Sequence, residues 1–395
     1  MANVTLTAQP QSLEEFLEVM RGLAPGFRER ALDGERLRSL PPESAAQLID
    51  AGVARMLVPK RWGGLELGLG AWLDVTLEAA RADASHGWCT SLLIQQPVMF
   101  ASFPEAAQAA VWAEGPNVAI AGSLMPVLRV ERVEGGYRIS GKSPFASGVS
   151  TASWVWLGGM VQSEAGGPPT WTLFLVPAGE YEVLDTWHMA AMSGTGSNTI
   201  VTDDVFVPEE RTVTWAQMVS GEAPGAQLHD NPLYRTPFAS YNTIGFAGTV
   251  LGAARGAYEH FRDSTKTKKT PGGGNVAETT SIQVQMARAS ADLDAAELLL
   301  RRMIATAEAP EGVTLELRAR SMRDSSRAAE LVLGAIDTLL ALSGTAGFAS
   351  TNPIQRAWRD IHFATRHASL SPENSFAHWG RTQLGVERPA SMPVY

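Results

Sequence analysis

The spacing of apolar residues divides the chain into three regions, and the first region follows a helical period. Within Leu13–Met20, apolar residues recur at intervals of three and four, which places them on one face of an α-helix. Ser12, followed three residues later by Glu15, is typical of a capping box at a helix start. A further helix is predicted over 71–84. The segment Leu57–Gly64 interrupts the helical pattern and predicts a turn.

The middle region changes to a period of two. Tyr137 and Ile139 alternate with polar neighbours directly after the turn dipeptide Gly135-Gly136, as expected of a half-buried strand. Short β-type runs bounded by glycine and proline follow. They lie at 154–157, 171–176 and 200–207. We predict a small β domain whose last strand is 200–207.

The third region returns to the helical period. Apolar residues from Ile282 to Leu300 keep the three-to-four spacing over five turns, which predicts a long helix with one buried stripe. Similar patterns run over 325–342 and from Ile354 towards His367. The predicted order is therefore helices, a β domain and a helical bundle, with domains at 1–115, 116–225 and 226–395.

Composition narrows the class of protein. A net charge of −9 argues against nucleic-acid binding, because phosphates require a concentrated basic surface. The basic run Lys266–Lys269 lies beside a Pro-Gly stretch and predicts a solvated loop. Residues 1–10 do not resemble a secretory signal, and the sequence has no apolar run of about 18 residues. We therefore expect a cytoplasmic protein and not one that spans a membrane. The single cysteine, Cys89, lies in an apolar run and is expected to be a buried structural thiol.

Several familiar catalytic signatures are missing from the sequence. We find neither a GxGxxG nor a GxxxxGK[ST] motif, so a Rossmann or P-loop nucleotide site is not indicated. The GxSxG and HExxH motifs are also absent. Of the histidines, only His362 and His367 lie close together, and a separation of five does not put both on one helical face. No metal centre is expected.

Two glycine-bearing turns of the β region are candidate ligand sites. They are Gly141–Gly148 and Met192–Thr199, both rich in serine or threonine. Small hydroxyl residues beside glycine let the backbone approach a planar or anionic ligand and offer hydrogen-bonding groups. The alternative is that both are ordinary hairpin or bulge turns, and spacing alone favours that alternative.

Four ordered segments resemble motifs of the acyl-CoA dehydrogenase superfamily. Leu57–Leu65 resembles its glycine turn after the second helix, Gly135–Lys142 its hairpin, Asp203–Pro208 the end of its β domain, and Gln355–Asp360 its C-terminal RxxRD helix. The resemblance covers nearly the whole chain. It implies an α+β fold: an N-terminal helical domain, a middle β-barrel or sandwich domain, and a C-terminal four-helix bundle.

Other segments resemble the two-component flavin-dependent monooxygenase branch of that superfamily. They are Phe145–Gly148, Ser193–Ser197, Arg366–Glu373 and Asn231–Arg235. The resemblance implies reduced FMN or FAD supplied by a separate NAD(P)H-flavin reductase. It further implies that O2 is activated as a flavin C4a-hydroperoxide, which oxygenates a small apolar or aromatic substrate. A homotetramer assembled through the C-terminal bundle is implied as well.

Two alternatives remain open. One is an acyl-CoA dehydrogenase or flavin oxidase with tightly bound FAD. Many dehydrogenases carry a glutamate base about nine residues after the RD pair, but here that place is near Ala368 and lacks a carboxylate. Glu373 follows Pro372 and is expected to cap the next helix. The other alternative is a non-catalytic binding or assembly protein that retains the fold.

The resemblance also assigns roles to individual residues. His367 is the leading catalytic candidate, since an imidazole can orient or deprotonate a phenol-like substrate; otherwise it is a helix-end histidine that makes a backbone bond. Ser147 is expected at the N5 edge of the flavin, with a plain turn serine as the alternative. The other expected cofactor contacts are Ser123, Leu124, Trp154, Gly344 and Thr345, of which the last two would reach a neighbouring subunit's flavin.

The chain departs from the branch at two places. Gln96 stands where many members carry a histidine, so a catalytic Gln96 can exchange hydrogen bonds but cannot change charge. Ser143 or Pro144 stands where the superfamily usually has a tryptophan, which leaves extra room near the flavin. If the chain is a monooxygenase, we expect it to handle its proton through His367 alone.

Overall fold

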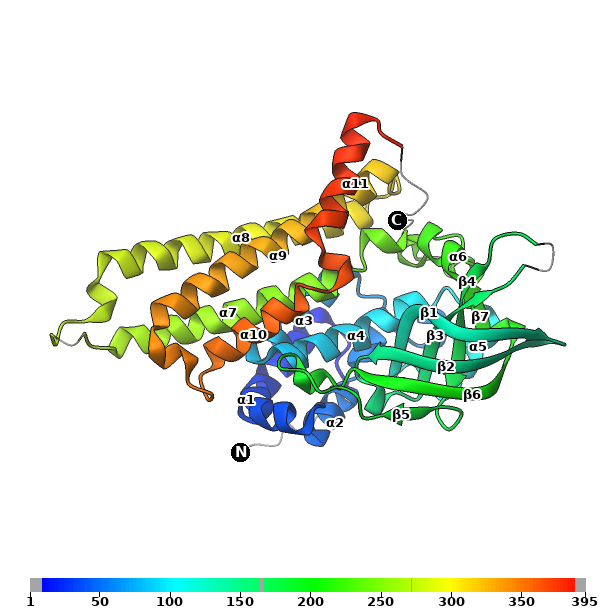
Figure 1. The fold of residues 1–395 in the computed structure, drawn as a ribbon, viewed down its shortest axis with the longest axis horizontal. Helices are drawn as coiled ribbons and strands as arrows, with labels where there is room; N and C mark the ends of the chain where they lie inside the picture. Colours follow the sequence, from blue (N-terminus) through cyan, green and yellow to red (C-terminus); the bar gives the residue numbers. More distant parts are fainter. Residues whose placement is uncertain (1–8, 164–165, 271, 388–395) are drawn as a thin grey trace.

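The computed structural model describes residues 9–163, 166–270 and 272–387. It places a β-sheet at one end of the molecule and a bundle of long helices at the other (Figure 1). Ser12 caps the first helix by accepting the backbone N–H of Glu15 at 3.3 Å. The Glu15 carboxylate accepts from Gln11 N–H instead of Ser12 N–H, so only half of the predicted capping box forms. The helices before the sheet are α1 (Leu13–Leu37), α2 (Pro42–Asp50), α3 (Leu69–Ala82), α4 (Ala84–Phe100) and α5 (Glu105–Val111).

The strands form one seven-stranded sheet in the described residues, in the order β5-β6-β2-β1-β3-β4-β7. β1 and β3 are parallel neighbours, whereas the other adjacent pairs are antiparallel. The strands are β1 (Ile120–Val133), β2 (Gly136–Ala146), β3 (Trp154–Val161), β4 (Thr170–Pro177), β5 (Glu182–Leu184), β6 (Asn198–Pro208) and β7 (Thr212–Thr214).

Both faces of the central strands are buried. In β3, Val155 and Leu157 join a small core made only of sheet and adjoining-turn residues, while Trp156 between them joins the large helical core. A strand buried on both faces reads as a continuous apolar run and not as an alternation. This explains why 154–157 and 171–176 show little polar spacing although both are strands. The helical core therefore supports the sheet from one side.

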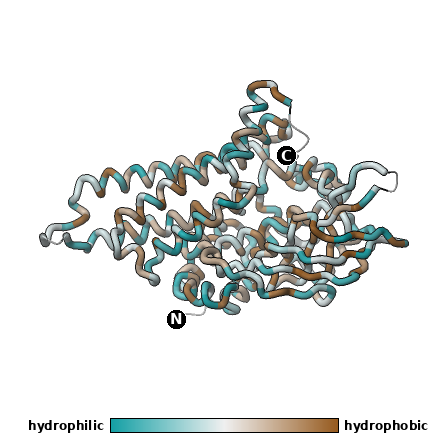
Figure 2. The backbone as a smooth tube through the Cα atoms, in the orientation of Figure 1, coloured by the Kyte–Doolittle hydropathy of each residue, from teal (hydrophilic) through white to brown (hydrophobic). Residues whose placement is uncertain are grey.

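The C-terminal helices form the far end of the molecule. α7, α8 and α9 run side by side away from the sheet (Figure 1), and hydrophobic and hydrophilic residues alternate along α8 and α9 (Figure 2). In the parts of the chain that the structure describes, no helix has the length and apolar character needed to cross a membrane. The later helices are α6 (Trp215–Ser220), α7 (Ile244–Thr267), α8 (Thr280–Ala307), α9 (Leu315–Ser343), α10 (Pro353–Ala364) and α11 (Pro372–Leu384).

The α+β fold class is confirmed, but several elements differ from those predicted, among them short ones such as β5 and α6. The strand predicted at 200–207 is β6, but it is not the last strand, because Thr212–Thr214 adds β7 beside β4. The helix α4 was not predicted. It is buried along most of its length, so its sequence lacks the polar stripe that reveals an amphipathic helix. The domain boundaries 1–115, 116–225 and 226–395 stay a proposal.

Candidate active site

The two glycine-bearing turns singled out in the sequence meet in the structure. The backbone N–H of Gly148 donates to the carbonyl of Thr195 at 2.9 Å. Beside this bond, the hydroxyl oxygens of Ser147 and Ser197 lie 2.6 Å apart, and those of Ser197 and Thr195 lie 2.7 Å apart. Thr195 and Ser197 are buried, whereas Ser147 is partly accessible. The turns therefore form one hydroxyl-lined unit with Ser147 at its accessible end.

The sheet opens beside this unit. β1 pairs with β2 only from Arg129 to Val133, whereas the earlier part of β1 pairs with β3. β2 pairs with β6 from Gly136 to Ala146. Ser123 and Leu124 lie on the diverging part of β1. A bulge follows them, and a Cβ on the facing Gly158 would lie 2.5 Å from the Leu124 carbonyl oxygen, so the bulge needs glycine there. The Ser123 hydroxyl is buried and has no hydrogen-bond partner in the described residues.

His367 reaches Ser147 through two aromatic rings. The His367 ring lies 4.3 Å from that of Phe246 and 5.9 Å from that of Trp88, centroid to centroid. Trp88 and Phe246 are themselves 4.7 Å apart. The indole Nε1–H of Trp88 donates to the Ser147 hydroxyl at 3.2 Å. We call these four residues, Ser147, Trp88, Phe246 and His367, the aromatic cluster. They come from the β2–β3 connection, α4, α7 and the α10–α11 connection, and contact one another in sequence.

The electrostatics of His367 favour a neutral imidazole. Desolvation lowers the pKa of its imidazole to about 4, although the residue as a whole is exposed in the single chain. The imidazole is neutral above pH 7 with or without this shift, because even an unshifted histidine is mostly uncharged there. Its Nδ1 accepts the backbone N–H of Ser369 at 3.3 Å, which assigns the ring proton to Nε2. His367 therefore makes the backbone hydrogen bond expected of a helix-end histidine. Its Nε2–H can still donate to a ligand.

Gln96 and Trp154 have contacts of their own. The Gln96 carbonyl oxygen accepts the indole N–H of Trp156 at 2.6 Å inside the core. Trp156 packs under Gly122, where a Cβ would meet its ring at 2.2 Å, so Gln96 supports the strand that carries Ser123. Trp154 is partly buried, with the Arg211 guanidinium 5.4 Å from its ring centroid. The predicted roles of Gln96 in catalysis and of Trp154 as a flavin wall stay predictions.

Gly344 and Thr345 lie far from the aromatic cluster. They follow α9 at the end of the bundle opposite the sheet (Figure 1), and both are exposed. Lys268 donates to the carbonyl of Ser343 at 3.2 Å and fixes the start of this turn. Within one chain these two residues do not join the site around Ser147. Their assignment to a flavin contact therefore depends on a neighbouring subunit.

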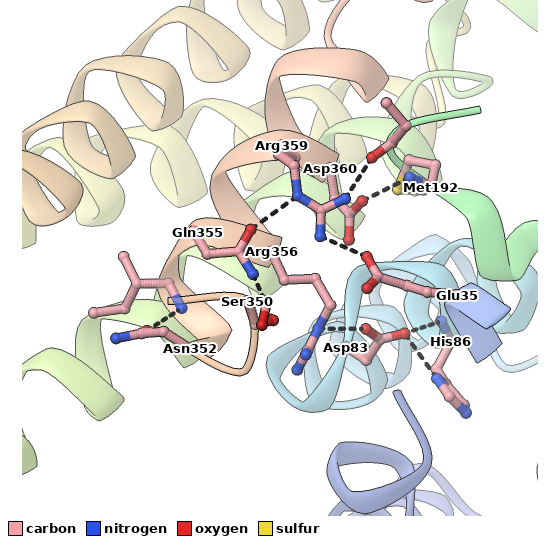
Figure 3. Close-up of polar contacts among 12 residues, drawn as sticks. Glu35, Asp83, His86, Met192, Ser350, Asn352, Gln355, Arg356, Arg359 and Asp360 are labelled. Carbon is pink, nitrogen blue, oxygen red and sulfur yellow. Dashed lines mark hydrogen bonds and ion pairs between the residues drawn. The ribbon is translucent and has the colours of Figure 1, made fainter. Parts of the chain in front are cut away.

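The RxxRD segment of α10 connects the helical bundle to the turn that carries Thr195 and Ser197 (Figure 3). The Asp360 carboxylate accepts the backbone N–H of Met192 at 2.6 Å. Arg359 donates to the carbonyl of Ala190 and forms an ion pair with Glu35 of α1 at 2.6 Å. This motif therefore has a structural role next to the site, because it holds both ends of the 190–192 segment.

Arg356 of the same segment belongs to a buried charge cluster with Asp83 and His86 at the start of α4 (Figure 3). Asp83 accepts from His86 Nδ1 at 2.8 Å and lies 3.5 Å from the guanidinium of Arg356. Burial opposes ionisation of Asp83, but hydrogen bonds from His86 and the charge of Arg356 outweigh it and lower the pKa. Burial, with the negative charge of Asp83 nearby, raises the pKa of Asp360 to about 7. The surroundings thus lower the pKa of the Asp83 carboxyl group and raise that of the Asp360 carboxyl group.

The raised pKa of Asp360 predicts a pH-dependent stability. An unfolded aspartate titrates near 3.9, so between about pH 4 and pH 7 the folded protein binds more protons, and stability falls as pH rises. Asp360→Asn retains an acceptor for Met192 N–H and removes the charge. We expect the variant to gain stability relative to the native protein from pH 5 to pH 8. Urea unfolding at both pH values measures this gain, and an equal difference at both would contradict it.

The residues present fit a flavin. The opening between β1 and β2, the partnerless Ser123 hydroxyl and the accessible Ser147 provide polar groups along one edge, and the aromatic cluster provides flat apolar walls of the kind that stack on ring systems. A Cβ at Gly148 would meet nothing within 4 Å, so space remains beside Ser147. The described residues contain no group of three or more acidic, histidine or cysteine side chains suited to a metal.

Sequence reasoning missed several residues of this site. Trp88 and Phe246 lie in apolar helical runs, where an aromatic residue ordinarily belongs to the core. Thr195 and Ser197 lie in a turn that the sequence marks, but the contact of Ser197 with Ser147 spans 50 positions. The available signals are the shared glycine-and-hydroxyl composition of the two turns and their resemblance to motifs of the same monooxygenase branch. Cys89 is buried as predicted, and burial raises the pKa of its thiol to about 12.

Comparison with known proteins gives a consistent family. Residues 244–372 match the family "Acyl-CoA dehydrogenase, C-terminal domain". The chain is 37% identical to a pigment production hydroxylase of Rhodococcus sp. (strain ATCC 21145), covering 96% of this chain and 98% of the relative. It is 35% identical to the FADH(2)-dependent resorcinol hydroxylase, oxygenase component, of Rhizobium sp. (strain MTP-10005), covering 98% of each.

A solved structure shows the same fold. The 3-HSA hydroxylase from Rhodococcus sp. RHA1 matches with a TM-score of 0.89 and 33% identity, covering 96% of this chain and 99% of that chain. The matched part, 96% or more of this chain in each comparison, spans both the sheet and the helical bundle. The chain therefore belongs to the flavin-dependent monooxygenases of the acyl-CoA dehydrogenase superfamily, as an oxygenase component of a two-component system.

Proposed function

We propose that this chain hydroxylates a phenolic or related aromatic ring with reduced FAD, delivered by a separate NAD(P)H-flavin reductase, and O2. The overall reaction inserts one oxygen atom into the ring, releases the other as water, and oxidises the flavin. Reduced flavin, when bound, supplies the two electrons for this reaction. The choice of an aromatic substrate and of FAD is supported by the resemblance to a FADH(2)-dependent resorcinol hydroxylase.

The observation that carries this proposal is the contact of His367 with Phe246, Trp88 and, through Trp88, Ser147. A neutral imidazole that presents Nε2–H can hydrogen-bond a phenol oxygen and stabilise its developing negative charge. The adjoining aromatic rings would hold a flat substrate by stacking. In this proposal His367 binds and orients the substrate oxygen, and Ser147 contacts the N5 edge of the flavin.

The proposed assembly is a homotetramer acting in the cytoplasm. Gly344 and Thr345 are exposed at the end of the bundle, as residues that contact a neighbouring subunit's flavin would be in an isolated chain. Phe348, in the same turn, is 63% exposed and could likewise contact a neighbouring subunit. The cytoplasm supplies the NAD(P)H that the reductase requires.

A coupled assay tests the proposed function. The protein is mixed with an NADH-dependent flavin reductase, FAD and a panel of simple phenols that includes resorcinol, and product formation is followed. We expect hydroxylated product that requires both the reductase and this chain. Reduction of protein-bound flavin by an acyl-CoA thioester, without any hydroxylated phenol, would instead support the dehydrogenase alternative.

A further inference from the structure

We infer that Ser197, together with Thr195, is a positioning residue that turns the Ser147 hydroxyl into a hydrogen-bond acceptor. The site would thereby favour reduced flavin over oxidised flavin. This inference rests on the proposed function for the placement of Ser147 beside N5. The chain of hydroxyl groups itself is independent of that placement.

The hydroxyl groups form an unbroken line that ends on a backbone carbonyl. Ser147 and Ser197 are separated by 2.6 Å, Ser197 and Thr195 by 2.7 Å, and Thr195 and the Met192 carbonyl oxygen by 2.8 Å. Each distance is that of a normal or short O–H···O hydrogen bond. At the other end, the Trp88 indole N–H lies 3.2 Å from the Ser147 oxygen.

The two ends of the line determine its direction. A carbonyl oxygen can only accept and an indole N–H can only donate. If Thr195 donates to Met192, Ser197 donates to Thr195 and Ser147 donates to Ser197, every contact contains one proton. The reverse direction leaves two oxygen atoms, those of Thr195 and Met192, 2.8 Å apart with no proton between them. The first direction is therefore the favoured one.

In that direction Ser147 has no proton left for a ligand. It accepts from Trp88 and donates to Ser197, so its remaining capacity is one lone pair. Reduced flavin carries a hydrogen on N5 and can donate to this lone pair. Oxidised flavin has only a lone pair on N5, so the same contact sets two acceptors against each other. Because of the hydroxyl line, Ser147 would bind the reduced flavin more tightly than the oxidised flavin.

The line is well anchored. Thr195 is 2% exposed and Ser197 5% exposed, so water does not readily replace either hydroxyl. Asp360 holds the Met192 N–H, and the Thr195 carbonyl accepts from Gly148 N–H. These contacts fix the distance between the two turns. They also explain how the RxxRD helix acts on the site without touching it.

The test measures binding of both redox forms of FAD. Dissociation constants are obtained by anaerobic titration for the native protein, Ser197→Ala and Thr195→Val. We expect tighter binding of reduced FAD by the native protein, and a fall of about tenfold in this preference in each variant, the scale of one net hydrogen bond. Ser197→Thr retains the hydroxyl and should restore the preference.

Ser193→Ala is the matched control. Ser193 lies in the same turn, but its hydroxyl donates to the Met189 carbonyl at 2.7 Å and takes no part in the line. We expect its redox preference to stay within about twofold of the native value. A Ser197→Ala variant that keeps the native preference would overturn the inference, as would a native protein that binds both forms equally. Failure to bind either form, and to hydroxylate, would count against the proposed function itself.

Discussion

Replacing His367 with alanine is expected to lower the rate of aromatic hydroxylation at least about 100-fold, the usual scale for the loss of an acid–base or charge-stabilising side chain. Binding of reduced FAD should change little, because Trp88 and Ser147 still form their side of the site. The electrons would then appear as H2O2. The measurement is the ratio of hydroxylated product to NADH consumed in the reductase-coupled assay.

A second substitution separates chemistry from turn structure. His367 also caps the short helix at Ala368–Leu370 by accepting Ser369 N–H, so His367→Ala alone removes both roles. Asparagine is a good N-cap residue and retains the acceptor without the imidazole. We expect His367→Asn to remain nearly as impaired as His367→Ala. Native activity in His367→Asn would show that only the cap matters. His188→Ala, at an exposed histidine, is the control.

The lowered pKa of His367 can be tested by NMR. Since its pKa is lowered to about 4, the imidazole stays neutral through the range in which an ordinary histidine titrates near 6.5. The Cε1 proton of His367 should therefore show little chemical-shift change between about pH 8 and pH 6 in the native protein. A titration midpoint near 6.5 would show instead that His367 is solvated like an ordinary histidine and that the surrounding rings do not lower its pKa.

Replacing Asp83 with alanine is expected to destabilise the protein by about 3–5 kcal/mol, the cost of leaving a buried charge without its partner. Arg356 is 6% exposed and lies 3.5 Å from Asp83. Asp83 also caps α4 through His86 N–H, so the substitution removes a helix cap as well. Urea unfolding followed by circular dichroism measures the change.

A surface ion pair supplies the comparison for Asp83. Asp33 and Arg36 lie 3.0 Å apart with highly exposed side chains, and removing such a pair costs at most about 1 kcal/mol. Asp33→Ala should therefore be close to native. If Asp83→Ala were as mild as Asp33→Ala, the cluster of Figure 3 would be a solvent-screened pair and not a structural support.

The sequence alone predicted those elements whose residues repeat a clear period. The stripe from Ile282 to Leu300 lies within α8, and 200–207 lies within β6. α4 was missed because it is buried on most sides, which erases amphipathic periodicity. β7 was missed because three residues, Thr-Val-Thr, are too few to show an alternation.

The site was only partly predictable for a different reason. Ser147 and His367 could be singled out because they lie in short motifs that resemble those of a known branch. Phe246 and Trp88, which join them, are over 150 residues apart in the chain and carry no local mark. Their contact results from the packing of α4 against α7. Local patterns cannot report such contacts, because they depend on which faces of distant helices meet.

Incorporation of ¹⁸O from O2 would show whether this protein is an aromatic monooxygenase. The native protein, an NADH-dependent reductase, FAD and the phenol panel are supplied with ¹⁸O2, and products are analysed by mass spectrometry. We expect one ¹⁸O atom in each new hydroxyl group, at a yield that falls sharply in His367→Ala. Hydroxyl groups without ¹⁸O, or complete recovery of the consumed O2 as H2O2 with every phenol of the panel, would contradict this expectation.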